Sequence, residues 1–432
     1  MTVTLPQAHA LRRELNDEAH ARPPEALTPP NAISFLALFD DAGDRQRQIS
    51  PLVSLCRRYD VPPPTSNINH FSIDLGPFRV KWERHTEFTR YKFIVFDPGG
   101  DPFERPAVTR VPQDWLETLP GNVIAAAEVA HVRMGESDIK FDALSARFFS
   151  GHPLVGSNVA GGAGIALTDL RIRDDGFSRF LLIDHALASR QAGRMVQRIV
   201  EIDAYRVLAL LALPIARDVL PRLLEAETEL AAISATMADE HQLVEPQLLD
   251  RLTRLEAQIQ HRHFETSSRF SAADAYYRLV RARIDELRET RITGIQTFSE
   301  FIERRLAPAM STCASVSARQ EKLSVRVGQT TQLLSTRVEI STQRQNQSLL
   351  ESMNRRAKLQ LRLQQTVEGL SVAAITYYIV GLVAVLARGL ASANVAIKPE
   401  LLVAASVPVV ALIVAIGVRR IRHAFSTGQH DD

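Results

Sequence analysis

Residues 369–387 read GLSVAAITYYIVGLVAVLA, and residues 401–418 read LLVAASVPVVALIVAIGV. Neither stretch contains a charged side chain, and each approaches the roughly 20 residues that an α-helix needs to cross a bilayer. A pair of buried core helices is the alternative, but uncharged runs of this length are more typical of membrane spans. The sequence therefore predicts a two-helix transmembrane hairpin over residues 369–418, with the lipid bilayer as a partner.

Basic side chains lie on both outer flanks of the predicted hairpin. The first span is preceded by Arg355, Arg356, Lys358 and Arg362, and the second is followed by Arg419, Arg420 and Arg422. The charged residues of the connecting loop are Arg388, Lys398 and Glu400. Lys and Arg concentrate on the cytoplasmic side of membrane proteins. We therefore expect the bulk of the chain and both termini in the cytoplasm, with residues 419–432 as a basic cytoplasmic tail.

Three polar side chains, Thr376, Tyr377 and Tyr378, lie in the middle of the first predicted span. A tyrosine hydroxyl at that depth needs a hydrogen-bond partner. The partner is either a neighbouring helix, which is the simpler explanation, or water in a pore. These three residues are therefore candidate intramembrane functional residues, and both explanations stay open.

The first part of the chain is rich in strand-forming patterns. Aromatic and β-branched residues, which favour strands, are frequent in residues 33–39, 71–75, 78–84, 88–96, 123–132, 165–173 and 177–183. Asp174, Asp175 and Gly176 form a typical hairpin turn between the last two segments. Short helices are expected at residues 9–21 and 114–118, and a helix interrupted by Pro51 at residues 44–59. Residues 1–185 are therefore predicted to form a mixed α/β domain.

Helical periodicity replaces this pattern from residue 186. Apolar residues recur every three or four positions over residues 187–230, 248–262 and 272–291, and a last helix runs from residue 295 into the membrane with a bend at Pro308. Between residues 319 and 368 the apolar stripe is thin and consists of Leu323, Val327, Leu334, Val338, Leu349, Met353 and Ala357. Such a stripe needs a partner helix or another subunit. We therefore predict an α+β protein with a helical bundle and coiled-coil stalk at residues 186–368, which forms a homo-oligomer through the stalk helices.

The composition excludes several classes of protein. The chain has 51 Lys and Arg against 49 Asp and Glu, a net charge of +2, which argues against a nucleic-acid partner. The two cysteines, Cys56 and Cys313, lie far apart and imply no disulfide framework. The glycine cluster of residues 155–164 lacks the Lys-Ser/Thr pair of a phosphate-binding loop, so a tight turn is expected there. No CxxC, HExxH or GxSxG motif occurs, so no catalytic, metal or cofactor site is predicted.

Two polar clusters come nearest to a chemical site. Glu83, His85 and Glu87 would project from one face, about 7 Å apart, if residues 82–88 formed one continuous strand, and could then hold a cation or a proton. If these residues formed the tip of a hairpin instead, they would be a solvated turn, which we favour because turns are polar. In the second cluster Asn16 and His20 share one helical face, followed by Arg22, or else form a capped helix end.

Four segments carry a resemblance to a known family. They are LNDEAHARPPEAL at residues 15–27, KWERHTEFTRYKF at 81–93, RIVEIDAYRVLAL at 198–210 and QLRLQQTVEGLSVAAITYY at 360–378. Together they resemble an uncharacterised family of bacterial membrane-anchored proteins, domain-of-unknown-function family 3422. The resemblance implies a protein of the bacterial inner membrane, and it brings no established ligand, cofactor or catalytic residue.

The order of the predicted parts is also similar to that of bacterial magnesium channels of the CorA type. Those channels end their first span with Gly-Met-Asn, whereas residues 386–389 of this chain are Leu-Ala-Arg-Gly, so magnesium selectivity is not expected. Three hypotheses follow. The leading one is a non-enzymatic, oligomeric, membrane-anchored scaffold or sensor. The second is a two-span ion channel or transporter, and the third is a hydrolase that uses Glu83, His85 and Glu87.

Overall fold

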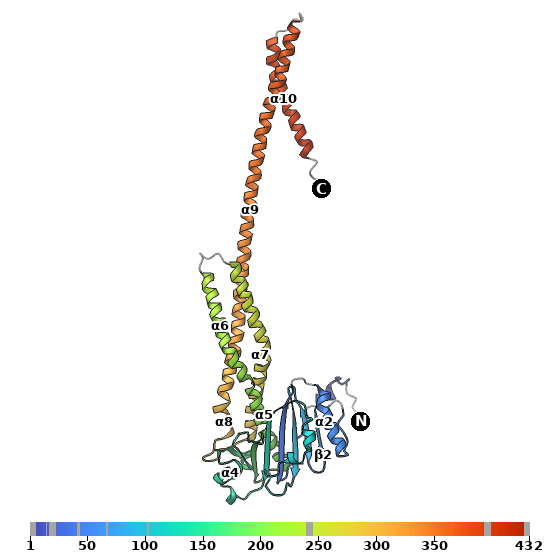
Figure 1. Cartoon of the computed structure of the whole chain (residues 1–432), viewed down its shortest axis with the longest axis vertical. Helices are drawn as coiled ribbons and strands as arrows, with labels where there is room; N and C mark the ends of the chain where they lie inside the picture. The colour runs from blue at the N-terminus through green and yellow to red at the C-terminus, as the bar shows by residue number, and fades with distance from the viewer. Residues whose placement is uncertain are drawn as a thin grey trace. The chain divides into compact units, whose positions relative to one another are not determined.

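The computed structural model describes residues 6–13, 15–16, 23–40, 44–65, 68–101, 103–238, 245–392 and 399–426. They belong to two compact units, Met1–Thr331 and Gln332–Asp432. The first unit contains a β-sheet and a bundle of helices, and the second contains a C-terminal pair of apolar helices (Figure 1). The α+β class is thus confirmed, and the change from strands to helices near residue 186 falls inside the first unit.

Within the described residues the sheet has eight strands, in the order β2-β3-β4-β1-β5-β8-β7-β6. They are β1 (Asn31–Phe39), β2 (His70–Asp74), β3 (Arg79–Arg84), β4 (Phe88–Phe96), β5 (Asn122–Val132), β6 (Val155–Val159), β7 (Gly164–Thr168) and β8 (Ser178–Asp184). Neighbouring strands are antiparallel except for β5 and β8, which are parallel. Every residue of β1 from Asn31 to Leu38 is buried, because both faces of the sheet are covered.

Each segment that was expected to form a strand contains one, although β7 ends at Thr168 rather than at residue 173. The sequence pattern did not predict β6, because VGSNV contains few strand-forming side chains. Gly161 and Gly162, with φ angles of 71° and 93°, form the expected tight turn between β6 and β7. The short helix α4 (Phe141–Phe148) was also not predicted.

One face of the sheet is covered by α2 (Arg45–Arg58), α3 (Gln113–Leu116) and α4. Trp82, Tyr91 and Phe93 pack there against Trp115, and the rings of Tyr91 and Trp115 lie 5.9 Å apart. The predicted interruption of α2 at Pro51 is wrong, because the helix continues through this residue. Pro51 is buried, and its carbonyl accepts a 2.7 Å hydrogen bond from Trp115 Nε1, so tertiary contacts offset the helix-breaking tendency of proline.

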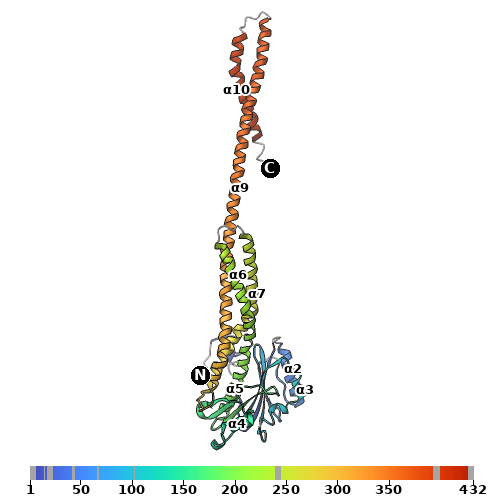
Figure 2. The same ribbon diagram turned by 60° about the vertical axis from the view of Figure 1, so that its left-hand side comes forward.

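The other face is covered by α5 (Ser189–Leu210), which also packs against α7 (Glu245–Leu287). The helix α6 (Ala212–Ala238) lies beside α7 in the helical bundle (Figure 2), and α8 (Phe298–Arg305) contacts β6 and α7. Gly193 lets α5 approach the segment before β1, since a Cβ atom at Gly193 would lie 1.8 Å from the carbonyl oxygen of Glu25. The sequence predicted two separate helices, whereas α7 is continuous. The residues between the two predicted helices are mostly polar, so the pattern did not indicate that Thr266 and Phe270 are buried there.

The long helix α9 (Ala307–Ser392) contributes residues to both units. The predicted bend at Pro308 is instead a break between α8 and α9, with Pro308 in the first turn of α9, where proline is tolerated. Leu323 and Val327 of the thin apolar stripe are buried inside the first unit. Nearby, Arg319 pairs with Glu227 of α6 at 2.7 Å, so this half of the stripe finds its partners within the same chain.

The second unit contains the C-terminal part of α9 and α10 (Pro399–Ser426), which folds back along α9 (Figures 1 and 2). Their most apolar 18-residue windows have mean hydropathies of 2.2 and 2.8, and only 6% and 0% of these windows are buried. In this respect they differ from a core helix of a soluble protein, which would be mostly buried. Among the described residues the chain thus has two helices that are long and apolar enough to cross a membrane, and they include the predicted spans at residues 369–387 and 401–418.

Candidate functional site

Four charged side chains of β3 and β4 lie on the face of the sheet that α5 covers. Side chains alternate along a strand, so Lys81 and Glu83 of β3 share this face with Arg90 and Lys92 of β4. The register pairs Lys81 with Lys92 and Glu83 with Arg90 directly across the two strands. All four side chains are at most 5% exposed. The sheet therefore places a group of charges in a layer where each charge needs a partner.

The helices supply the remaining partners. Glu201 of α5 accepts hydrogen bonds from Arg90, at 2.6 Å, and from Arg283 of α7. Arg90 also donates from its Nε atom to Glu83. Lys81 Nζ lies 3.4 Å from the Glu83 carboxylate. We call these five residues, Lys81, Glu83, Arg90, Glu201 and Arg283, the buried ion network; it joins the sheet to α5 and α7.

The electrostatics of the buried ion network keep its acids ionised. Burial alone would raise the pKa of Glu83, but the positive charges of Arg90, Lys92 and Lys81 hold it well below its ordinary value. Burial likewise opposes ionisation of Glu201, but Arg90 and Arg283 lower its pKa to about 2. In contrast, burial lowers the pKa of Lys92 to about 8. Both carboxyl groups are therefore ionised near neutral pH, and each is paired with an arginine.

A groove lies beside this network at the turn between β3 and β4. β3 ends at Arg84 and β4 begins at Phe88, and His85 N donates a 2.9 Å hydrogen bond to the carbonyl of Phe88. The continuous-strand alternative is therefore wrong, and the hairpin alternative is confirmed. Glu83 points into the buried layer, whereas His85 and Glu87 line the groove. The three residues do not form a common site, which removes the basis for a hydrolase mechanism through them.

The groove has a volume of about 690 Å³ and combines charged and aromatic side chains. Glu87 accepts hydrogen bonds from Arg269 at 2.8 Å and from the Tyr276 hydroxyl at 2.9 Å, both on α7. The ring of Tyr276 stacks on Tyr205 of α5 with a centroid distance of 5.7 Å. We call this the hairpin groove; it is lined by Asn69, Arg84, His85, Glu87, Tyr205 and Tyr276, among others.

The second predicted cluster is only partly visible. Asn16 is helical and exposed, whereas His20 and Arg22 lie outside the described residues. The segment that follows them reaches the buried ion network, because the Pro23 carbonyl accepts a 2.6 Å hydrogen bond from Lys81 Nζ. Glu25 pairs with Arg79 at 3.0 Å. Three of the four segments that carry the family resemblance, residues 15–27, 81–93 and 198–210, therefore contact one another at the buried ion network.

Sequence reasoning missed five charged residues of this buried layer, namely Lys81, Arg90, Lys92, Glu201 and Arg283. Two signals could have identified them. Arg90 and Lys92 are charges at alternate positions of a strongly β-forming segment, and Glu201 interrupts the apolar face of α5. A charge in such a place is buried and must have a partner.

The part of the chain that the structure describes contains neither a metal-ligand cluster nor a disulfide. No group of three or more His, Cys, Asp or Glu side chains there could hold a metal ion. Cys56 and Cys313 are buried and unpaired, and burial raises the pKa of both thiols, which disfavours the reactive thiolate. In the apolar part of α9, Thr376 Oγ1 donates to the carbonyl of Val372 at 2.7 Å, whereas Tyr377 and Tyr378 are 78% and 71% exposed.

Comparison with known proteins identifies a family but no function. A family model described as "Protein of unknown function (DUF3422)" matches residues 7–425. Since the match covers nearly the whole chain, the chain belongs to this family. Neither a curated protein nor a solved structure matches the chain.

A further buried carboxyl group, Glu128 of β5, lies on the opposite face of the sheet. It is 3% exposed, and Ser34 Oγ donates to its Oε2 atom at 2.8 Å. Its Oε1 atom has no hydrogen-bond partner among the described residues. Burial raises the pKa of Glu128 to about 8, so this side chain is a neutral acid at pH 7.

We expect Glu201→Gln to lower the free energy of unfolding of the first unit by about 3 kcal/mol. Arg283 and Arg90 both lose the buried carboxylate to which they donate, although Arg90 keeps Glu83. Both tryptophans, Trp82 and Trp115, lie in the sheet core, so tryptophan fluorescence during urea unfolding of the full chain measures this effect. Glu286→Gln is the matched control, since Glu286 pairs with the same Arg283 but is 42% exposed. Its substitution should cost less than about 1 kcal/mol. Equal effects of the two variants would contradict the role of the buried ion network.

We expect Glu128→Gln to change how stability depends on pH. The folded-state pKa of about 8 lies above the ordinary value of 4.5, so the stability associated with the protonated carboxyl group is fully present below pH 4.5. Between pH 4.5 and about 8 this stability is lost, at roughly 1.4 kcal/mol per pH unit. The variant should therefore match the wild type near pH 4 and be more stable by up to a few kcal/mol near pH 8. Urea unfolding at both pH values tests this, and parallel pH curves would refute it.

Proposed function

We propose that this member of a family of unknown function is an oligomeric sensor or scaffold anchored in the bacterial inner membrane. The observation that carries the proposal is the continuity of α9. Its first turns pack Met310, Cys313 and Val316 into the main hydrophobic core of the first unit. The same helix continues without a break to Ser392 and contains an apolar window that is long enough to cross a bilayer.

Contacts within the first unit connect the hairpin groove to α9. Glu87 of the groove binds Arg269 and Tyr276 of α7. The neighbouring residue Phe270 of α7 lies in the same core as Met310 and Cys313 of α9. A ligand that displaced α7 at the groove would therefore disturb the packing of α9. This supports a sensing role in which a ligand binds in the hairpin groove and changes the packing of α9.

Charge supports the orientation of the proposed anchor. Four basic residues precede the first predicted span, the nearest of them seven residues before Gly369, and three follow the second span closely; they are Arg355, Arg356, Lys358, Arg362, Arg419, Arg420 and Arg422. By the positive-inside rule, both of these flanks lie in the cytoplasm. The first unit precedes the first flank along the chain, so we place it in the cytoplasm as well.

The exposed apolar residues of α9 support an oligomer. Residues 342–367 of this helix are all exposed, yet Leu349, Met353 and Leu363 are apolar and follow a spacing close to a heptad repeat. These three side chains are 60%, 64% and 67% exposed. A second copy of α9 would cover them, and it would also stabilise a helix that gains little from propensity alone.

We expect the full chain in detergent to be an oligomer, and we expect Leu349→Glu or Met353→Glu to shift it toward the monomer, because a charge in the seam opposes association. Mass measurement by light scattering after size-exclusion chromatography gives the result. Ser348→Glu is the control, since Ser348 lies on the polar face with Arg344, Glu351 and Arg355. A monomeric wild-type chain, or dissociation by the control substitution, would refute the proposal.

A second function, that of a two-span ion channel or transporter, is favoured by one observation. The rings of Tyr377 and Tyr378 are largely exposed in the apolar part of α9, and their hydroxyl groups form no hydrogen bond with a described residue. In an oligomer these hydroxyl groups would face either a neighbouring helix or a water-filled pore. The order of the predicted parts, which is similar to that of CorA-type channels, is consistent with the pore.

Flux measurements distinguish the two functions. If the chain is a channel, the oligomer reconstituted in liposomes will conduct a monovalent or divalent cation, and Tyr377→Phe with Tyr378→Phe will reduce the flux because the pore loses its polar groups. Absence of flux for common cations, from liposomes in which the oligomer is verified by cross-linking, would exclude the channel and leave the sensor or scaffold.

A further inference from the structure

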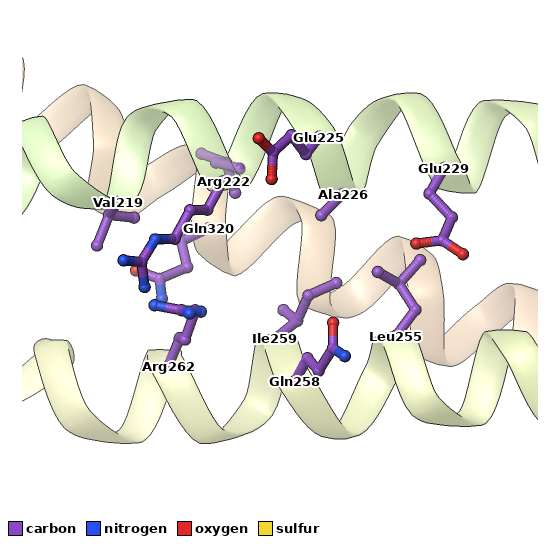
Figure 3. A pocket seen from close by; sticks show the side chains of 11 residues that line it. Val219, Arg222, Glu225, Ala226, Glu229, Leu255, Gln258, Ile259, Arg262 and Gln320 are labelled. Carbon is purple, nitrogen blue, oxygen red and sulfur yellow. The ribbon is translucent and has the colours of Figure 1, made fainter.

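A second pocket, separate from the hairpin groove, lies between the helices of the bundle and is open to solvent on one side. It has a volume of about 310 Å³ and is lined mainly by α6 and α7, with Gln320 contributed by α9 (Figure 3). We call it the bundle pocket. The residues that matter for its chemistry are Arg222, Glu229, Leu255, Ile259, Arg262 and Gln320.

Two arginines from opposite helices meet at one end of this pocket. The guanidinium groups of Arg222, on α6, and Arg262, on α7, extend toward each other across the space between the helices (Figure 3). Arg222 has an exposed partner in Asp218, at 3.3 Å. Arg262 forms no ion pair with any residue that the structure describes. Arg222 is exposed and Arg262 is half-buried, so both guanidinium groups are open to an anion that enters from solvent, and their two positive charges attract it.

A buried amide adds a third polar group at the same end. Gln320 is only 3% exposed, and its Oε1 atom accepts a 3.2 Å hydrogen bond from Thr266 Oγ1. Because its oxygen is engaged by Thr266, the NH₂ group of the amide remains as a donor, and the amide lies beside the two guanidinium groups (Figure 3). All three groups at this end of the pocket can therefore donate hydrogen bonds.

The rest of the pocket limits what can enter. Leu255 and Ile259 form an apolar wall next to the arginine end, and Glu229 lies beyond them at the far end, 3.4 Å from Arg251 (Figure 3). The acidic side chain of Glu225 lies one turn from Arg222 on α6 and disfavours an anion anywhere but in the space between the two arginines. The volume of about 310 Å³ is at the lower limit for small-molecule sites.

We propose that the bundle pocket binds a small oxyanion, a phosphate or carboxylate group, between Arg222 and Arg262 with the Gln320 amide as a further donor. Guanidinium groups bind such oxyanions through paired, charge-assisted hydrogen bonds. A short aliphatic part of the ligand would contact Leu255 and Ile259. Binding would connect α6 to α7 and thereby stabilise the bundle that holds the first part of α9.

The test uses the full chain in detergent and measures binding by isothermal titration calorimetry, with thermal unfolding as a second readout. Inorganic phosphate and succinate are the two probes, which distinguish a phosphate from a carboxylate ligand, and chloride at equal ionic strength corrects for screening. We expect saturable binding of at least one probe, with a rise in the unfolding temperature. Arg262→Gln and Arg222→Gln should each weaken it by about tenfold or more.

Arg254→Gln is the matched control, because Arg254 lies on the same helix, pairs with Asp250 and does not line the pocket. This variant should bind the probe as the wild type does. If Arg262→Gln fails to fold, Arg262→Lys, which keeps the charge but loses the fork of donors, should still fold and bind more weakly. The proposal is overturned if neither probe binds saturably, if chloride has the same effect, or if the Arg254 variant loses binding to the same extent.

Discussion

Glu201 is the side chain on which the arrangement of the first unit depends. It lies on α5, contacts Arg90 of the sheet and Arg283 of α7, and is almost completely buried. Buried charges are tolerated only when they are paired, so each of the three elements is held at the position that pairs its charge. The apolar contacts of the core are not directional, whereas these hydrogen bonds define how α5 and α7 lie on the sheet.

The buried ion network also explains why the hairpin groove has its present form. The β3 and β4 strands that carry Glu83 and Arg90 end in the turn that contains His85 and Glu87. The helix that carries Arg283 also carries Arg269 and Tyr276, which bind Glu87. The ion pairs between the sheet and the two helices therefore also fix the positions of the residues that line the hairpin groove. This dependence suits a recognition site, because a preformed groove loses little conformational freedom when a ligand binds.

The sequence predicted the strands well and the helix limits less well. Strands such as residues 33–39 and 88–96 are runs of aromatic and β-branched residues, which are a local signal. The ends of helices depend on context. The helix α2 passes through Pro51 because Trp115 and the sheet pack against it, and α7 continues through polar residues because Thr266 and Phe270 are buried in the bundle. Similarly, the turn at residues 85–87 could not be distinguished from a continuous strand until the register of β3 and β4 was known.

By itself, the sequence determined the two apolar helices at the C-terminus, the α+β class and the family, because uncharged runs, strand-forming segments and whole motifs are properties of neighbouring residues. Only the tertiary structure decided which charges meet. Arg90 and Glu201, which form an ion pair, are separated by 111 positions, and Arg222 and Arg262 belong to different helices. Their convergence follows from strand register and helix packing, and these are set by contacts between residues that are distant in the sequence.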